Sequence, residues 1–248
     1  MDTLKLYANG LLGRETLLEI EVLGQPLRLV VTTRRELRRA RQMWHERALI
    51  ERMRETLDDG DVLFDVGANI GLVSLLMGLH TAGRGVSVHG FEPEPRNFEH
   101  FERNIEENGL GASVSAHRIA LGAGEGEVEL FVRGRAGEGR HSIAEERGST
   151  ASIRVPSRTA ASFAAECGQS PTVVKIDVEG AEGRVLAGFE ELMEDAPPRD
   201  VFLEIHSKGD RDRMPGGGTI ADWLGERGFG LVWNSARRSG EHVHYQRG

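Results

Sequence analysis

The chain has 248 residues, enough for one large domain or two small ones with a buried core. Its formal net charge of −8 argues against nonspecific nucleic-acid binding, because such binding depends on neutralising phosphates with basic side chains. The single cysteine, Cys167, excludes an intrachain disulfide and a multi-cysteine zinc site. The sequence contains neither an apolar run of about 18 residues nor the start of a signal peptide. We therefore expect a soluble, cytoplasmic protein that does not enter a membrane.

The first 60 residues predict two antiparallel strands followed by a helix. Alternating segments at residues 17–22 and 26–31 flank Leu23, Gly24 and Gln25, a hairpin signal. Apolar residues then recur at helical spacing over residues 34–57, and Gly60 is expected to stop that helix. We expect residues 1–60 to pack as an extension on a domain of residues 61–248.

From residue 61 the pattern changes to short apolar strands that alternate with helices, which is typical of a parallel sheet covered on both faces. The expected strands are residues 62–64, 86–91, 113–121, 173–176 and 201–205, with helices at 72–79 and 97–108. Residues 127–132 predict an extra antiparallel strand, and residues 230–233 and 242–245 a terminal strand pair.

Residues 133–150 have no apolar periodicity and are rich in glycine and arginine. We expect a long loop, which is either a solvated connection or a lid over a site. The glycines after Pro215 predict a plain turn before a helix at Ile220.

The strongest chemical signal is residues 61–71, DVLFDVGANIG, in which a strand runs into a glycine turn that opens a helix. Gly67 and Gly71 let the backbone turn tightly and let a ligand approach. The start of the helix offers unpaired N–H groups to an anionic group such as a carboxylate. Glu92, at the end of the next strand, is placed to accept hydrogen bonds from both ribose hydroxyls of a nucleotide.

The residues of this turn favour S-adenosylmethionine over a dinucleotide. Asp65 would repel a pyrophosphate, and Asn69 stands where the dinucleotide template needs its second glycine. S-adenosylmethionine has no phosphate but carries a sulfonium and an ammonium, so Asp65 is expected to anchor its methionine end. The alternatives are a nicotinamide-dependent oxidoreductase, a noncatalytic binding module, and a structural turn without a ligand.

A second charged segment, residues 175–182 (KIDVEGAE), follows an apolar strand. Ligands in open α/β sheets bind outside the carboxyl ends of the strands, so Asp177 is expected to face the cofactor. Glu179 and Glu182 are three residues apart and share a face on a helical turn. Alternatively, these acids only stabilise the start of a helix.

Residues 65–71, 91–98 and 175–182 together resemble the FkbM family of S-adenosylmethionine-dependent methyltransferases. The resemblance covers residues 46–206 and implies a class I, Rossmann-like α/β fold with a mostly parallel seven-stranded sheet. It implies methyl transfer, often to a hydroxyl of a sugar or natural product. Glu46 resembles an acid that the family tends to carry before the first motif, whereas Thr159, Ala160 and Ala161 depart from the family's Thr-Leu-Asp. The cofactor-binding residues expected from these motifs are Asp65, Gly67, Ala68, Asn69, Gly71, Glu92, Pro93, Asp177 and Glu179.

Transfer to a hydroxyl benefits from a base, and the strand ends supply three candidates: Asp177, Glu204 and His206. Glu204 and His206 lie on the same side of a strand, and His206 is the first choice because imidazole titrates near neutrality. Alternatively, His206 is a polar strand end without chemistry. The same three residues could hold a divalent metal, although we do not predict one. His141 could reach a bound acceptor.

The predicted acceptor is a small molecule, such as a sugar or an anionic glycoside. A local run of arginines is either a solvated helix face or a patch for an anionic acceptor; it comprises Arg34, Arg35, Arg38, Arg39 and Arg41. A nitrogen or macromolecular acceptor remains an alternative, but aromatic residues are only 6% of the chain, which disfavours nucleic acid. His242 and His244 are expected to be surface or packing residues. The sequence leaves the oligomeric state open.

Overall fold

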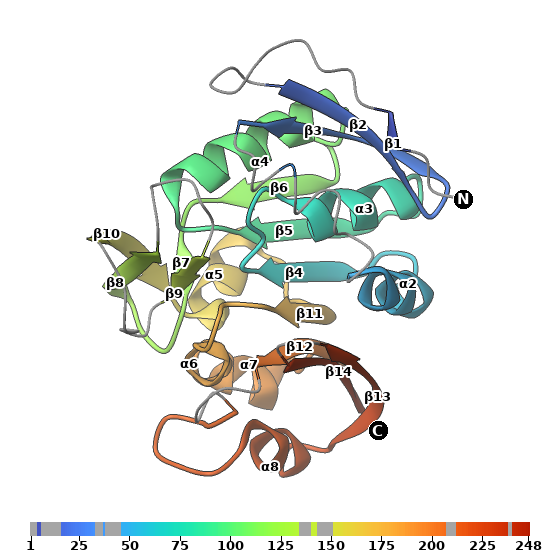
Figure 1. Cartoon of the computed structure of the whole chain (residues 1–248). Coiled ribbons are helices and arrows are strands. Elements are labelled where there is room, and N and C mark those ends of the chain that lie inside the picture. The colour runs from blue at the N-terminus through green and yellow to red at the C-terminus, as the bar shows by residue number, and fades with distance from the viewer. Residues whose placement is uncertain are drawn as a thin grey trace.

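A seven-stranded sheet organises the chain (Figure 1). The computed structural model describes residues 4–5, 16–32, 37, 46–133, 140–142, 151–206, 212–237 and 240–248; at 4–5, 132–133, 140–142, 151 and 206 it describes the backbone alone. The strand order is β13-β14-β12-β11-β4-β5-β6, and β14 alone runs antiparallel to the other strands of the sheet. These strands are Phe229–Arg237, Gly240–Arg247, Asp200–His206, Val173–Ile176, Val62–Val66, Ser87–Phe91 and Val114–His117.

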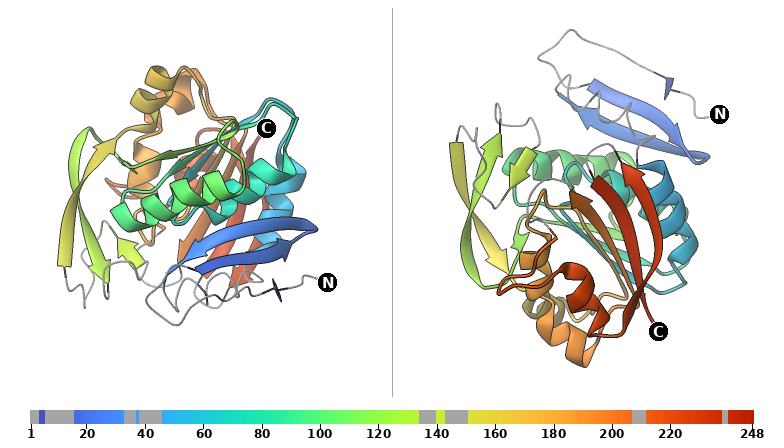
Figure 2. Two further views of the ribbon diagram at one scale, coloured as in Figure 1. Left: turned by 90° about the horizontal axis from the view of Figure 1, so that it is seen from above. Right: turned by 60° about the horizontal axis from the view of Figure 1, so that its bottom comes forward.

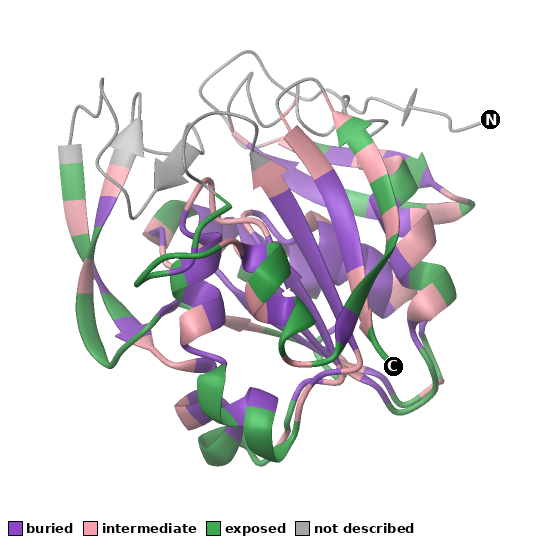
Figure 3. Cartoon of the chain, turned by 90° about the horizontal axis from the view of Figure 1, so that it is seen from below, coloured by how far each residue is buried: buried purple, intermediate pink, exposed green. Residues whose placement is uncertain are grey.

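Helices cover both faces of this sheet, so its central strands are buried (Figure 3). On one face, Leu63 and Phe202 pack under α2 (Arg47–Thr56), α3 (Leu72–His80) and α4 (Pro95–Glu107). The other face packs against the remaining helices: α5 (Ala160–Cys167), α6 (Glu182–Ala187), α7 (Glu190–Asp195) and α8 (Ile220–Gly225). This is the α/β architecture with a mostly parallel seven-stranded sheet that the resemblance implies. No helix in the described ranges has the length and apolarity needed to span a bilayer.

The N-terminal hairpin forms an outer layer over the first face (Figure 2). Strands β2 (Thr16–Val22) and β3 (Gln25–Val31) pair as predicted, and β1 (Leu4–Lys5) pairs with β2. Buried residues of the hairpin, including Leu18 and Leu27, join the same apolar cluster as α3 and α4. The Asn104 side chain of α4 accepts a hydrogen bond from the Val30 N–H at 2.6 Å. The hairpin is therefore part of the core of the molecule.

A smaller sheet of order β7-β10-β8-β9 stands at one side of the molecule (Figures 1 and 2). Its strands are Ala120–Leu121, Ala151–Arg158, Gly126–Arg133 and Arg140–Ser142. The extra antiparallel strand predicted at residues 127–132 is β8, and its partner β10 was not predicted. The single strand expected over residues 113–121 is wrong, because β6 and β7 belong to different sheets.

The structure revises two further boundaries. Helix α2 ends at Thr56, and Leu57 is extended, so Gly60 (φ 80°) belongs to the turn before β4 instead of stopping the helix. The helix expected to begin at Asn97 begins at Pro95, because the Glu94 side chain accepts a hydrogen bond from the Asn97 N–H at 2.7 Å. Most of residues 33–45 and 133–150 lies outside the described residues, so the expected start of the first helix and the lid remain expectations.

The connections place the chemistry at the carboxyl edge of the parallel strands. The chain runs from β4 outward to β5 and β6, and then returns to β11 on the other side of β4. The loops after β4 and β11 therefore diverge, which is where α/β sheets bind ligands. Both predicted motifs follow these two strands.

Candidate functional site

The turn between β4 and α3 satisfies its own N–H groups. The Gly67 and Ala68 N–H groups both donate to the Phe91 carbonyl at 3.0 Å, and the Gly71 N–H donates to the Ala68 carbonyl at 2.9 Å. The Asn69 N–H donates to Glu92 Oε2, and the Ile70 N–H to Asn69 Oδ1, both at 2.9 Å. The N–H groups of residues 67–71 are therefore not free to bind an anion, while the expectation for the N–H groups at the start of α3 stays a prediction.

Two glycines in this turn are sterically required. Gly67 has φ 79°, and a Cβ there would lie 2.0 Å from the Asp177 carbonyl oxygen. Gly71 has φ 88°, and a Cβ there would lie 2.0 Å from Cδ2 of Phe101. Asn69 also adopts a left-handed conformation, with φ 56°. The turn therefore packs directly on the loop after β11 and on α4, so its shape depends on both.

Asp65 is fully buried and bonded within the protein. Its Oδ2 accepts hydrogen bonds from the Ser74 N–H at 3.1 Å and the Ser74 hydroxyl at 2.6 Å, which ties β4 to the first turn of α3. Its Oδ1 lies 2.9 Å from Lys175 Nζ. Asp65 and Lys175 are direct neighbours on β4 and β11, on the face that α3 covers. The structure thus shows Asp65 as an internal anchor of the turn, while contact with a cofactor stays a prediction.

Lys175 joins the turn to the loop after β11. Its ammonium also donates to the Gly67 carbonyl at 3.4 Å. Burial by itself lowers the pKa of Lys175, but the carboxylates of Asp65, Asp177 and Glu46 outweigh burial and raise it. The side chain therefore stays charged, and it lies in the field of three acids from separate parts of the chain.

Glu92 lies where the sequence places it, at the end of β5 beside the turn. Besides Asn69, its carboxylate accepts from the Glu94 N–H at 3.0 Å and from the Asn97 side chain at 3.3 Å. Only 5% of the residue is exposed, and burial raises its pKa to about 7. These three donors orient the carboxylate and hold it on the turn.

The loop after β11 brings the second motif to the same edge. The Asp177 N–H donates to the Val66 carbonyl at 3.0 Å, which fixes Asp177 next to the end of β4. Glu179 is left-handed, with φ 55°, and the Gly180 N–H donates to Glu182 Oε1 at 2.9 Å. Asp177 and Glu179 are half-buried, whereas Glu182 is fully buried. Glu179 and Glu182 therefore have different surroundings instead of one shared helix face.

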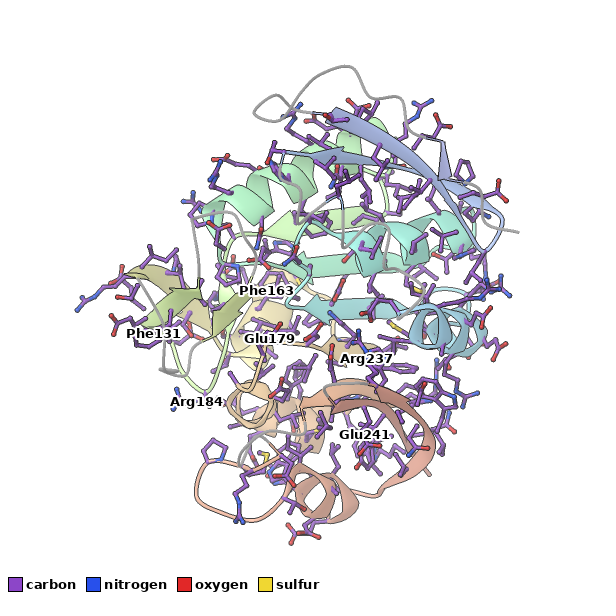
Figure 4. The ribbon with its side chains drawn as sticks, in the orientation of Figure 1. Phe131, Phe163, Glu179, Arg184, Arg237 and Glu241 are labelled. Atoms are coloured by element: carbon purple, nitrogen blue, oxygen red, sulfur yellow. The ribbon has the colours of Figure 1, made fainter. Side chains whose placement is uncertain are left out.

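A group of polar and charged side chains lies over β12, β13 and β14, and the sequence analysis does not predict that they meet. We call this group the Arg237 cluster; it comprises Glu46, Glu204, Arg237 and His242. Arg237 bonds Glu46 at 2.6 Å, Glu204 at 2.8 Å and His242 Nε2 at 2.8 Å. His242 Nε2 also lies 3.3 Å from Glu46 and 3.6 Å from Glu204. Arg237 and Glu179 are labelled near the centre of the view in Figure 4.

Electrostatics links the Arg237 cluster to the second motif. Burial raises the pKa of Glu46. The charges of Arg237 and His242 lower it, whereas those of Asp177 and Glu204 raise it further. Burial lowers the pKa of His242 to about 4, so the imidazole is neutral at pH 7. The fields of Asp177 and Lys175 also act on His242. The cluster therefore lies within electrostatic range of Asp177 in the loop after β11.

The structure therefore brings most of the predicted site residues to one edge of the sheet. Among the base candidates, Glu204 is buried and paired with Arg237, and Asp177 lies beside the turn. The backbone of His206 ends β12 at this edge, but its side chain is outside the described residues. The described side chains contain no group of three or more metal-ligating residues, a search that leaves out His206. The His141 side chain and the arginines of residues 34–41 also lie outside the described part.

The sequence analysis does not bring Glu46, Arg237 and His242 together as one group, although the resemblance points to Glu46 as an acid before the first motif. They come from three distant segments, and antiparallel β14 brings them together by inserting between β12 and β13. A second signal is the strand face that His242 and His244 share, but the structure gives the two side chains different surroundings. His244 is buried two residues further along β14, where its Nε2 lies 2.7 Å from Asp200 Oδ1 and its ring stacks on Phe202. The packing prediction is confirmed for His244.

Comparison with known proteins agrees with this geometry. Residues 65–231 match the family described as "Methyltransferase FkbM domain". The hexuronic acid methyltransferase AglP of Haloferax volcanii is 29% identical over 187 residues, 75% of this chain and 73% of that protein. The 31-O-demethyl-FK506 methyltransferase FkbM of Streptomyces tacrolimicus is 32% identical over 178 residues, 60% of this chain and 67% of that protein.

Among solved structures, the methyltransferase FkbM of Methylobacillus flagellatus superposes with a TM-score of 0.50 at 16% identity. The superposition covers 76% of this chain but 44% of that one, so this chain spans less than half of that relative. The similarity supports the fold.

Proposed function

The chain belongs to the FkbM methyltransferase family, and from that premise we propose that it transfers the methyl group of S-adenosylmethionine to a hydroxyl of a sugar or natural-product-like small molecule. Residues 61–248 form the methyltransferase domain in this proposal, and residues 1–60 are an extension packed on it. The observation that carries the choice of cofactor is the internal bonding of the turn between β4 and α3.

A dinucleotide cofactor needs free backbone N–H groups at this turn for its pyrophosphate. In this chain the N–H groups of residues 67–71 are all bonded within the protein, one of them to the carboxylate of Glu92. The surrounding acids, Glu92, Asp177 and Glu179, suit a cation. The site therefore favours a sulfonium cofactor without phosphates over a nicotinamide dinucleotide.

Each site residue has a role in this proposal. Glu92 accepts the ribose hydroxyls, and the turn of Gly67, Ala68 and Asn69 lies against the nucleoside, with Gly71 and Pro93 shaping it. Asp177 and Glu179 face the positively charged end of the cofactor, and Asp65 acts on that end through Lys175 and the turn. Asp177 and His206 contact the acceptor, whereas Glu204 holds Arg237.

In this reaction the protein itself forms no covalent bond to the substrate or the cofactor. S-adenosylmethionine supplies an electrophilic methyl group, and the protein has to hold the acceptor oxygen about 3–3.5 Å from that carbon in line with the leaving sulfur. The rigid edge formed by the turn and the loop after β11 supports such positioning, because Gly67 packs directly against the Asp177 backbone.

Isotope transfer tests the proposal. The protein is incubated with S-adenosylmethionine bearing a deuterated methyl group and with a panel of hexuronic acids, neutral hexoses, polyhydroxylated macrolides, amines and RNA. We expect labelled methyl ethers of a small-molecule hydroxyl and an equal amount of S-adenosylhomocysteine. The names of the two relatives support including uronic acids and macrolides. Labelling of amines or RNA alone, or failure of S-adenosylmethionine to bind, would contradict it.

A further inference from the structure

The Arg237 cluster has the composition and location of an acceptor subsite. Its four side chains come from the residue before α2 and from β12, β13 and β14, and all lie at the edge that carries the turn after β4. The field of Glu46 reaches Lys175, whose ammonium contacts the Gly67 carbonyl of the cofactor turn. The cluster therefore lies within electrostatic range of a side chain that contacts the turn.

Within the cluster, Glu46 is the member best placed to meet a ligand. Its side chain is 25% exposed, compared with 9% for Glu204, 19% for Arg237 and 1% for His242. One Glu46 oxygen bonds Arg237 and the other faces His242 at 3.3 Å. A carboxylate has about four lone-pair positions, so Glu46 keeps capacity to accept a further hydrogen bond.

We propose that Glu46 is the general base of the methyl transfer, held in place by Arg237. This rests on the proposed function. As the acceptor oxygen bonds the methyl carbon, its O–H bond breaks and the proton passes to the Glu46 carboxylate. The carbon–sulfur bond breaks in the same step, and its electron pair leaves with the sulfur of neutral S-adenosylhomocysteine.

The charges around Glu46 suit this role. His242 is neutral at pH 7, so among the described residues Arg237 is the positive charge that contacts Glu46, and Lys175 is also coupled to it electrostatically. Asp177 and Glu204 are negative and raise the pKa of Glu46, as does its burial. A carboxylate with a raised pKa is a stronger base than an exposed glutamate. Glu204, which is more buried, holds the guanidinium from the other side as a positioning residue.

The test compares Glu46→Gln with Glu51→Gln, using the acceptor labelled by the wild type in the isotope panel. Gln keeps the shape of Glu46 and an oxygen for Arg237, but it cannot take a proton. We expect kcat to fall on the order of 10²–10⁴-fold, with S-adenosylmethionine affinity within about twofold of the wild type. Glu51 is a matched control, because it is on the adjacent helix and forms an exposed ion pair with Arg47. Its variant should keep wild-type kcat.

Two further variants separate a base from a structural role. Glu46→Asp retains a carboxylate and should recover part of kcat and an acid limb in the single-turnover pH profile. His206→Asn should retain that acid limb. If Glu46→Gln keeps kcat within about threefold, or if His206→Asn loses the acid limb, the assignment to Glu46 is wrong. A wild type that methylates nothing on the panel contradicts the proposed function itself and is thereby distinguished from failure of this inference.

Discussion

Some charged side chains of this protein are buried away from water, so their charge has to be stabilised by other protein groups. Asp65 is fully buried, and Lys175 is its ion-pair partner. The sequence identified both residues as charged members of motifs at strand ends. Their direct pairing could not be predicted, because it depends on the parallel register between β4 and β11, which are over 100 positions apart.

Removal of Lys175 should therefore be costly. We expect Lys175→Met to lower the free energy of unfolding by about 3–5 kcal/mol, because it leaves the Asp65 carboxylate buried without its cation. Arg47→Ala removes the exposed pair with Glu51 and should lower it by less than about 1 kcal/mol. Urea denaturation of both variants provides the measurement. Equal losses would show that the Asp65–Lys175 pair is not a buried charge pair in solution.

A second residue-scale prediction concerns the His89–His117 pair, whose ring nitrogens Nδ1 and Nε2 lie 3.0 Å apart. Burial, with a smaller contribution from His89, lowers the pKa of His117 from 6.5 to about 4. The unfolded chain thus binds a proton that the folded chain does not, so stability is full above pH 6.5 and is lost as pH falls toward 4.

Between pH 7 and pH 5, this difference should remove about 1–2 kcal/mol of unfolding free energy. His117→Phe cannot titrate and should lose less over the same interval, although His89 still contributes. Denaturation curves of the two proteins at both pH values give the comparison. A variant that loses as much as the wild type would show that His117 titrates normally in the folded protein.

At the scale of elements, the turn between β4 and α3 depends on close backbone packing as well as on glycine's conformational freedom. Gly67→Ala should distort the turn, because its Cβ would overlap the Asp177 carbonyl, and should abolish cofactor binding. Gly83→Ala is the matched control. Gly83 has the same φ of 79° but nothing within 4 Å of its Cβ, so it should cost about 1–2 kcal/mol and leave cofactor affinity unchanged. Calorimetric titration distinguishes the two, and equal affinities would refute the packing argument.

The elements that the sequence predicted are those with a strong local pattern. The hairpin turn at Leu23 and Gly24, the helix α3 and the glycine turn after β4 have periodicity or turn residues of their own. The four-stranded sheet was predicted only in part. Strand β10 alternates in burial, but it contains Pro156, which argues against a central strand, and its pairing with β8 crosses residues 134–150, whose sequence has no apolar periodicity.

At the scale of the whole molecule, the candidate site joins the two ends of the chain. Glu46 precedes α2, while Arg237 and His242 belong to the last two strands. Each motif could be read from the sequence because its residues are contiguous. The Arg237 cluster could not, since its members meet only once β14 has inserted beside β12. The N-terminal extension, which packs into the core, therefore also contributes to the site edge.

The central claim is that this edge binds S-adenosylmethionine through ionised Glu92. The pKa of Glu92 is raised to about 7 by burial, so the ionised fraction increases with pH through that value. S-adenosylmethionine affinity should therefore rise roughly tenfold between pH 6 and pH 7.5. Over this interval the cofactor's amino group stays largely protonated.

Isothermal titration calorimetry with S-adenosylmethionine at these two pH values tests the claim most directly. We expect Glu92→Gln to bind roughly tenfold or more weakly at pH 7.5, without the rise with pH. Glu99→Gln, an exposed change on α4, should match the wild type. Wild-type binding that does not change with pH, or a Glu92→Gln variant that binds as tightly as the wild type, would contradict the account.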